Sequence, residues 1–288
     1  MEWYLFAFAS AFFTALLVIV EKKSLLKEHA LEFCSVLSIF IFLLSFTFIK
    51  FVDFNLGWNT WALLALESLF VSISSLFIAK AIRHMEVSLV SPLLVLLPVF
   101  VLFFSFIILK ESVSFLQLLG IFLLIIGIYI LETHKRNFLK PFTEIVKFKY
   151  VNYIFLALVL SSLSLIIGRY LLSGGLVNIY SLTFISSGFF MIYLVVLIFI
   201  LHDGFKGIVH GFKTSGMLIF FVAVFTIVAK LTQNQAILMQ KVTLVEIIRR
   251  MNVLIVIFLG GELFHEKNLL KKIIATLVML AGAYFVLI

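Results

Sequence analysis

Three charged residues, Glu246, Arg249 and Arg250, lie inside a long apolar stretch of the chain. A charge at the centre of a membrane-spanning helix costs about 2.5–3.5 kcal/mol on insertion scales. Three unpaired charges facing lipid would therefore cost roughly 10 kcal/mol, so this helix face is expected to turn inward. Glu246 and Arg250 are one helical turn apart and can pair, which leaves Arg249 over. Two interpretations follow: a buried ion pair that fixes this helix against its neighbours, or a charged face that lines a substrate cavity.

A second polar stripe precedes this segment. Thr226, Lys230, Gln233 and Asn234 recur at the spacing of one helix face. Lys230 is again a charge in an apolar run, and the neighbouring amides add hydrogen-bonding capacity. The stripe is therefore expected to face the same interior space as Arg249.

Milder polar positions occur elsewhere in the chain. Ser68, Ser72 and Ser75 form a stripe on one helix face that begins one residue after Glu67, and Arg169 lies near the end of an apolar run. Serines at this spacing also allow two helices to pack closely in a membrane, which is the structural alternative for Ser72 and Ser75.

All these charges fall in the same half of the predicted membrane layer. If they converge, four cations face two acids, and the space favours an anionic ligand. Arginine offers a planar fork to a carboxylate or phosphate, and lysine a point charge. Glu67 and Glu246 lie well inside the apolar runs, so either is a candidate proton carrier if transport is proton-coupled.

The composition identifies the medium that surrounds these residues. The chain has 288 residues, of which 64% are hydrophobic and 12% charged, and it contains 35 Phe. A soluble domain of this length could not bury so much apolar surface. About 20 apolar residues cross a bilayer as a helix. The sequence divides into ten such runs: 2–20, 31–50, 61–80, 87–109, 115–133, 150–172, 178–202, 215–235, 242–264 and 269–288. Their lack of polar–apolar alternation favours helices over membrane barrel strands.

Basic residues in the linkers are concentrated on one side of the predicted membrane layer. The linkers opposite the N-terminus hold Lys22, Lys23, Lys27, Lys80, Arg83, Lys135, Arg136, Lys140, Lys147, Lys149, Lys206, Lys213, Lys267, Lys271 and Lys272, and those on its own side hold Lys50, Lys110 and Lys241. Positively charged loops stay in the cytoplasm, so the bias predicts a plasma-membrane protein with both termini outside.

The chain also repeats itself. The stretch AIRHMEVSLVSPLLVLLPVFV (81–101) aligns without gaps to AILMQKVTLVEIIRRMNVLIV (236–256), and the same offset pairs Glu111 with Glu266 and Gly127 with Gly282. The predicted units are 1–133 and 150–288, joined by a basic linker at 134–149. Each unit holds five helices, so the two must insert with opposite orientations. Inverted repeats with a midplane site are a recurrent transporter design.

Segment 81–131 resembles the repeat unit of the drug/metabolite transporter superfamily, EamA type. The matching features are Pro98, Glu111, Gly120 and Gly127. The resemblance implies an all-α integral membrane protein with ten transmembrane helices in two inverted five-helix repeats, working by alternating access. It also implies cytoplasmic termini, which is opposite to the charge bias; the charge bias is preferred here.

Two prolines, Pro92 and Pro98, fall within the run 87–109 and remove backbone donors there. They are expected to bend the helix, either as a gate beside the cavity or as a static kink.

Other chemistry is not indicated by the sequence. The histidines show no metal-ligand spacing, no nucleophile pairs with a base, and no glycine-rich phosphate loop is present. No enzyme activity, metal, cofactor or nucleic-acid partner is therefore expected.

The predicted function is secondary-active transport of a small polar, anionic metabolite across the bilayer, by a monomer or homodimer. An alternative is export of neutral or zwitterionic amino acids or drug-like solutes, with the buried charges purely structural. A membrane-embedded lipid enzyme and a scaffold are weaker alternatives.

Overall fold

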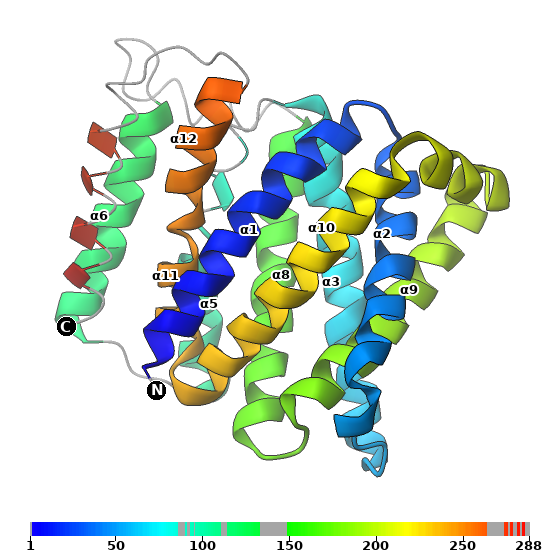
Figure 1. The fold of residues 1–288 in the computed structure, drawn as a ribbon. Helices are drawn as coiled ribbons and strands as arrows, with labels where there is room; N and C mark the ends of the chain where they lie inside the picture. Colours follow the sequence, from blue (N-terminus) through cyan, green and yellow to red (C-terminus); the bar gives the residue numbers. More distant parts are fainter. Residues whose placement is uncertain are drawn as a thin grey trace.

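A computed structural model describes residues 2–85, 90, 93–94, 96–110, 114–132, 149–263, 274–275, 277–278, 281–282 and 284–285. The regular structure in these ranges is helical, and Figure 1 shows the helices packed as one bundle. Six helical segments are long and apolar enough to cross a membrane: Trp3–Leu25, Ala30–Phe51, Trp58–His84, Tyr150–Ser173, Ile179–Leu201 and Phe205–Met239. The expected membrane helices are confirmed at these places, while the count of ten and the inverted repeat stay predictions.

The first of these are α1 (Trp3–Leu25), α2 (Ala30–Ser45) with the 3₁₀ segment η1 (Phe46–Phe51), and α3 (Trp58–His84). His29 caps α2: its ring accepts the Leu31 N–H, while Glu32 accepts the His29 backbone N–H. Further along the chain are α6 (Phe115–Glu132), α8 (Lys149–Ser173) and α9 (Ile179–Leu201). Asn178 caps α9 by accepting the Ser181 N–H.

Pro98 lies at the start of a helix and not in its interior. α5 (Leu97–Phe104) has Pro98 in its first turn, where a missing N–H breaks no internal bond, and it continues into the π-helical segment η2 (Ser105–Leu109). Pro92 lies outside the described residues, and a gating role for either proline stays a prediction.

The eighth helix is much longer than its apolar run. It was expected over 215–235, but α10 extends from Phe205 to Met239. Residues 205–214 carry two lysines, a histidine and two glycines, which is typical of a linker. In the structure they form the start of α10, and Gly207 and Gly211 lie against α2. A β-carbon at Gly211 would lie 3.0 Å from a Val36 methyl carbon, so a larger residue there would require Val36 to shift.

The ninth run was expected to be one helix over 242–264, and this is wrong. It divides into α11 (Val242–Arg249) and α12 (Asn252–Leu263), with Arg250 and Met251 between them. The backbone bonds at the division join residues three apart, as from Met251 N–H to the Ile248 carbonyl. The side chains of α11 and α12 therefore do not form the continuous face that a single helix would give.

Helices from the two halves of the chain alternate in the bundle. α1 packs along α10, α3 along α8, and α2 against both α9 and α10 (Figure 1). The polar residues of α1, α3, α8 and α10 are thereby brought toward one interior space.

Candidate functional site

An interior cavity of about 350 Å³ lies between α1, α3, α8, α10 and the junction of α11 with α12. Much of its wall is apolar, with Leu17, Val71, Leu97, Leu158 and Phe190 among the contributors. The polar and charged residues of the wall are Thr14, Glu21, Glu67, Ser74, Ser75, Ser161, Ser164, Thr183, Ser187, Thr226, Lys230, Gln233, Asn234, Arg249, Arg250 and Asn252. Such a concave space, apolar with a few grouped polar side chains, is the usual form of a small-molecule site.

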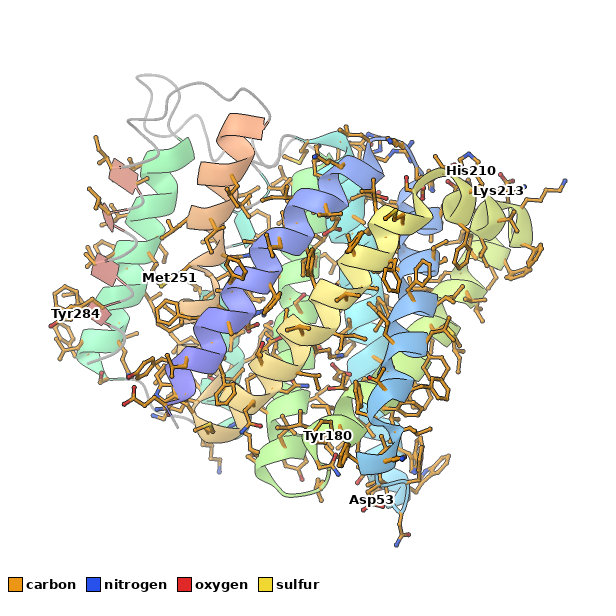
Figure 2. All side chains as sticks on the ribbon, in the orientation of Figure 1. Asp53, Tyr180, His210, Lys213, Met251 and Tyr284 are labelled. Carbon is orange, nitrogen blue, oxygen red and sulfur yellow. The ribbon has the colours of Figure 1, made fainter. Side chains whose placement is uncertain are left out.

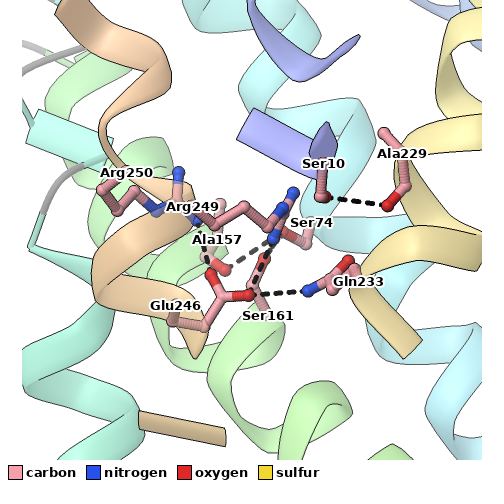
Figure 3. A network of polar contacts seen from close by, with 9 residues as sticks. All are labelled: Ser10, Ser74, Ala157, Ser161, Ala229, Gln233, Glu246, Arg249 and Arg250. Carbon is pink, nitrogen blue, oxygen red and sulfur yellow. Dashed lines mark hydrogen bonds and ion pairs between the residues drawn. The ribbon is translucent and has the colours of Figure 1, made fainter. Parts of the chain in front are cut away.

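A charged network forms one wall of the cavity. Glu246 is fully buried; Arg249 Nη1 donates to its Oε1 at 2.8 Å and Arg250 Nη2 to its Oε2 at 3.3 Å. Gln233 Nε2 donates to the same Oε1 at 2.6 Å, which links α10 to α11 (Figure 3). One carboxylate therefore serves two guanidinium groups, so this network retains one uncompensated positive charge.

The division between α11 and α12 positions this network. Arg250 follows the end of α11, where the chain turns, and its side chain still reaches back one turn to Glu246. The triad of Glu246, Arg249 and Arg250 thus shows features of both interpretations. Glu246 is held in a buried ion pair, and both arginines also line the cavity.

Several polar atoms at the cavity have no hydrogen-bond partner in the described part of the chain. They are Arg249 Nε, Arg250 Nε, Asn252 Oδ1 and Thr14 Oγ1. Lys230 likewise has no ion-pair or hydrogen-bond partner among those residues, and its side chain lines the cavity. Buried polar groups without partners are costly, so the arginine and Thr14 atoms are available to acceptors on a ligand, and Asn252 Oδ1 to a donor.

Glu67 forms a second, separate polar centre. It accepts hydrogen bonds from Ser68 Oγ at 3.2 Å, Ser164 Oγ at 3.1 Å and Ser186 Oγ at 2.7 Å. These serines come from α3, α8 and α9, so the carboxyl group joins three helices. Its partners are neutral hydroxyls, in contrast to the two arginines that hold Glu246.

Other polar contacts hold the walls together. Ser10 Oγ donates to the Ala229 carbonyl at 2.8 Å, between α1 and α10, and Ser74 bonds with Ser161 between α3 and α8 (Figure 3). Asn234 Nδ2 donates to Thr183 Oγ1 at 3.2 Å, between α10 and α9.

The structure places most of the predicted substrate residues on the cavity. They are Glu67, Ser75, Lys230, Gln233, Asn234, Arg249 and Arg250. Three others do not line it. Glu246 lies behind the arginines, Ser72 Oγ donates to the Ser68 carbonyl, and Arg169 Nη1 donates to the Ile237 carbonyl of α10. These contacts favour structural roles for Ser72 and Arg169.

Glu21 is a cavity residue that the sequence did not single out. It lines the cavity on the same face of α1 as Thr14. The spacing of Thr14 and Glu21, two helical turns apart, was the available signal. Lys22 instead donates to the Ile82 and Met85 carbonyls at the end of α3.

Comparison with known proteins agrees with this architecture. No curated protein matches the chain. One solved structure, described only as a crystal structure of a protein, superposes with a TM-score of 0.73 over 98% of this chain and 95% of its own, at 11% sequence identity. At that identity the likeness shows the fold alone. Residues 1–133 match the model of the EamA-like transporter family. Over residues 1–133 the chain is thus similar to the EamA-like transporter family, which is consistent with the drug/metabolite transporter superfamily that its sequence resembles.

Proposed function

We propose that the protein is a secondary-active transporter that carries a small polar, anionic metabolite through this cavity by alternating access. The observation that carries the proposal is the excess of cationic donors on one wall. Arg249 and Arg250 share the single carboxylate of Glu246, and Lys230 has no partner among the described residues. A carboxylate or phosphate on the ligand would satisfy these donors and balance their charge.

Alternating access is supported by the way the halves interleave. α1 pairs with α10 and α3 with α8, and α5 contacts α11. In the predicted repeat α1 corresponds to α8 and α3 to α10, so the pair α1–α10 corresponds to the pair α8–α3. Two repeats that can exchange conformations in this way can open the cavity to each side of the membrane in turn.

Transport in proteoliposomes tests the ligand class. A panel of organic acids, sugar phosphates and amino acids should show saturable uptake of an anion. Lys230→Ala and Arg249→Ala should each reduce that uptake at least about tenfold, as expected for loss of a charged hydrogen bond of about 1.5–3 kcal/mol. Lys50→Ala removes an exposed cation far from the cavity and serves as the control. Unchanged anion uptake in both cavity variants would contradict the proposal.

Export of neutral or zwitterionic solutes is a second candidate. It is favoured by the complete burial of Glu246 and its bonds to both arginines, since a satisfied ion-pair network can be purely structural. On that alternative, uptake of amino acids or uncharged solutes exceeds that of anions and survives Lys230→Ala.

The orientation follows from the charge bias. Both termini are proposed to lie outside the plasma membrane, with the basic linkers in the cytoplasm. Reporter fusions at each terminus should give an extracytoplasmic signal. A cytoplasmic signal from both fusions would reverse the assignment.

A further inference from the structure

Two acids and three histidines gather at one end of the bundle, where α1 turns into α2 and α9 turns into α10. Glu28 and His29 lie in the first turn, Glu32 in the first helical turn of α2, His202 at the end of α9 and His210 near the start of α10. His210 is labelled at this end of the molecule in Figure 2. The sequence places these histidines only at helix ends, without any clustering.

Glu32 is the centre of the group. Its Oε1 lies 3.2 Å from His202 Nε2, its Oε2 lies 3.3 Å from His210 Nδ1, and Oε2 also accepts the His29 backbone N–H at 3.1 Å. These contacts connect the first half of the chain to the second. Both imidazoles can donate to the carboxylate when neutral, and more strongly when protonated.

His29 differs from the other two histidines. Its Nδ1 accepts the Leu31 N–H at 3.4 Å, so that nitrogen carries no proton, and its ring stacks on His202 with centroids 4.4 Å apart. Burial lowers the pKa of His29, and a charge on His202 would lower it further. His29 is therefore the neutral member of the stack.

Glu28 is the unusual member. Its side chain is 2% exposed, and neither carboxyl oxygen has a hydrogen-bond partner in the described ranges. The Ser215 hydroxyl of α10 lies nearby and acts to lower the pKa of Glu28, but it makes no hydrogen bond to the carboxyl group in this arrangement. Gly211 lets the carboxyl group pack directly on α10, because a β-carbon there would lie 3.2 Å from Glu28 Oε2.

Burial raises the pKa of Glu28 above its ordinary value, and the charge of Glu32 acts in the same direction. A desolvated carboxylate without partners is expensive, whereas the protonated acid fits the same space at low cost. The packed arrangement therefore favours the protonated form of Glu28.

We propose that Glu28 is a proton-binding site whose occupancy controls a latch, namely the contacts of Glu28 with α10 and of Glu32 with His202 and His210. With the proton bound, the α1–α2 turn packs on the start of α10. When the proton leaves, a second buried negative charge appears beside Glu32 and weakens the packing.

The sign follows from Glu28. Glu28 favours the closed latch when protonated, and this contribution is lost as pH rises through its raised pKa. Acidification therefore closes the latch, and alkali loosens it.

In the described part of the chain, the other charged groups around the cluster are five cations and one exposed acid. Lys27 comes from the turn, Lys80 and Arg83 from the end of α3, and Lys206 and Lys213 flank His210 on α10. Asp203 is exposed in the α9–α10 turn. The cations favour the ionised acid and the neutral histidine, but Lys27, Lys206 and Lys213 are exposed, and solvent and salt screen them more than the buried carboxyl group.

The latch joins the two halves of the chain at one end of the bundle, so its opening would release one face of the proposed transporter. Only that consequence rests on transport; the proton site itself does not.

Distance measurement between spin labels tests the latch without any substrate. Cys34, the single cysteine, is replaced by alanine, and labels are attached at Leu26→Cys and Lys213→Cys, both exposed positions on opposite sides of the latch. A short, narrow distance distribution is expected at pH 5.5, and a longer, broader one at pH 8.5. Glu28→Gln, which mimics the protonated acid, should keep the short distribution at both values. The exposed acid variant Asp203→Asn should respond to pH as the parent does.

Two further measurements keep the test decisive if Glu28→Gln folds poorly. Glu28→Asp retains a titratable group and should still respond to pH. In the unsubstituted protein, amide hydrogen exchange is measured in residues 26–36 and 202–216 and corrected for the intrinsic effect of pH. Its rate should rise about tenfold per pH unit between the pKa of Glu28 in the open latch and its higher pKa in the closed latch. Distances and exchange that do not change between pH 5.5 and 8.5, or an undiminished shift in Glu28→Gln, would overturn the proposal. Loss of anion uptake without these changes concerns the cavity alone.

Discussion

Glu246→Gln should lower the free energy of unfolding by about 3–5 kcal/mol, more than replacement of either arginine that it binds. The carboxylate is fully buried and neutralises two guanidinium groups at 2.8 and 3.3 Å. Without its charge, two neighbouring cations remain in the interior with no compensating acid. Arg249→Gln has a smaller expected cost, because it leaves Glu246 and Arg250 as a balanced pair.

The comparison can be made by denaturing the purified protein in mixed micelles and following its helical content. Asp53→Asn, an exposed acid, is the matched control and should change the unfolding free energy by less than about 0.5 kcal/mol. The double variant Glu246→Gln with Arg250→Gln should regain part of the loss, because it removes one stranded cation; the cycle isolates the coupling of the pair. Equal losses from Glu246→Gln and Arg249→Gln would show that the carboxylate does not hold both arginines.

The difference in stability cost between Glu246 and Arg249 variants also determines which of them can be used to test transport. Because Arg249 can be removed without stranding a buried charge, Arg249→Ala is expected to fold, and a loss of transport in it reports on ligand binding. Glu246 variants cannot be used in that way, since their folding is at risk. The structural and functional interpretations of the triad are therefore separable by residue.

The membrane character of the fold was predictable because a helix that crosses lipid needs a long apolar run, which is visible in the sequence. The long apolar runs became α1, α2, α3, α8 and α9 within a few residues of their expected bounds. Where hydropathy does not predict the helix, contacts with other helices determine its length. The local sequence at the start of α10, with its glycines and lysines, is typical of a linker. It does not show that the glycines pack against α2.

The candidate site was predictable in its charges and less so in its geometry. Periodicity placed Lys230, Gln233 and Arg249 on inward faces, and all three line the cavity. The division at Arg250 was not visible, since neither glycine nor proline marks it. The approach of His202 and His210 to Glu32 was also hidden, because it joins helix ends that are distant in sequence and carry no local pattern.

The contrast between Glu246 and Glu67 predicts where a coupling proton would bind. Glu246 is fixed in its ionised form by two arginines, whereas Glu67 is bound by the hydroxyls of Ser68, Ser164 and Ser186. A hydroxyl can donate to a carboxylate or accept from a carboxylic acid, so both protonation states of Glu67 can be satisfied in place. Glu67 also lines the cavity, within reach of a ligand that competes for the proton.

Glu67→Gln should therefore reduce anion accumulation driven by a pH gradient at least about tenfold, while exchange of labelled for unlabelled anion without a gradient continues, because glutamine keeps hydrogen bonds with the serines but binds no proton. The two assays are run on the same proteoliposomes, with Glu2→Gln, an exposed acid near the N-terminus, as the control. Gradient-driven accumulation that survives in Glu67→Gln would remove Glu67 as the carrier. Uptake by the parent protein that ignores the gradient would exclude proton coupling altogether. Loss of both accumulation and exchange would instead assign Glu67 to joining α3, α8 and α9, since a structural role affects both assays and a coupling role only the first.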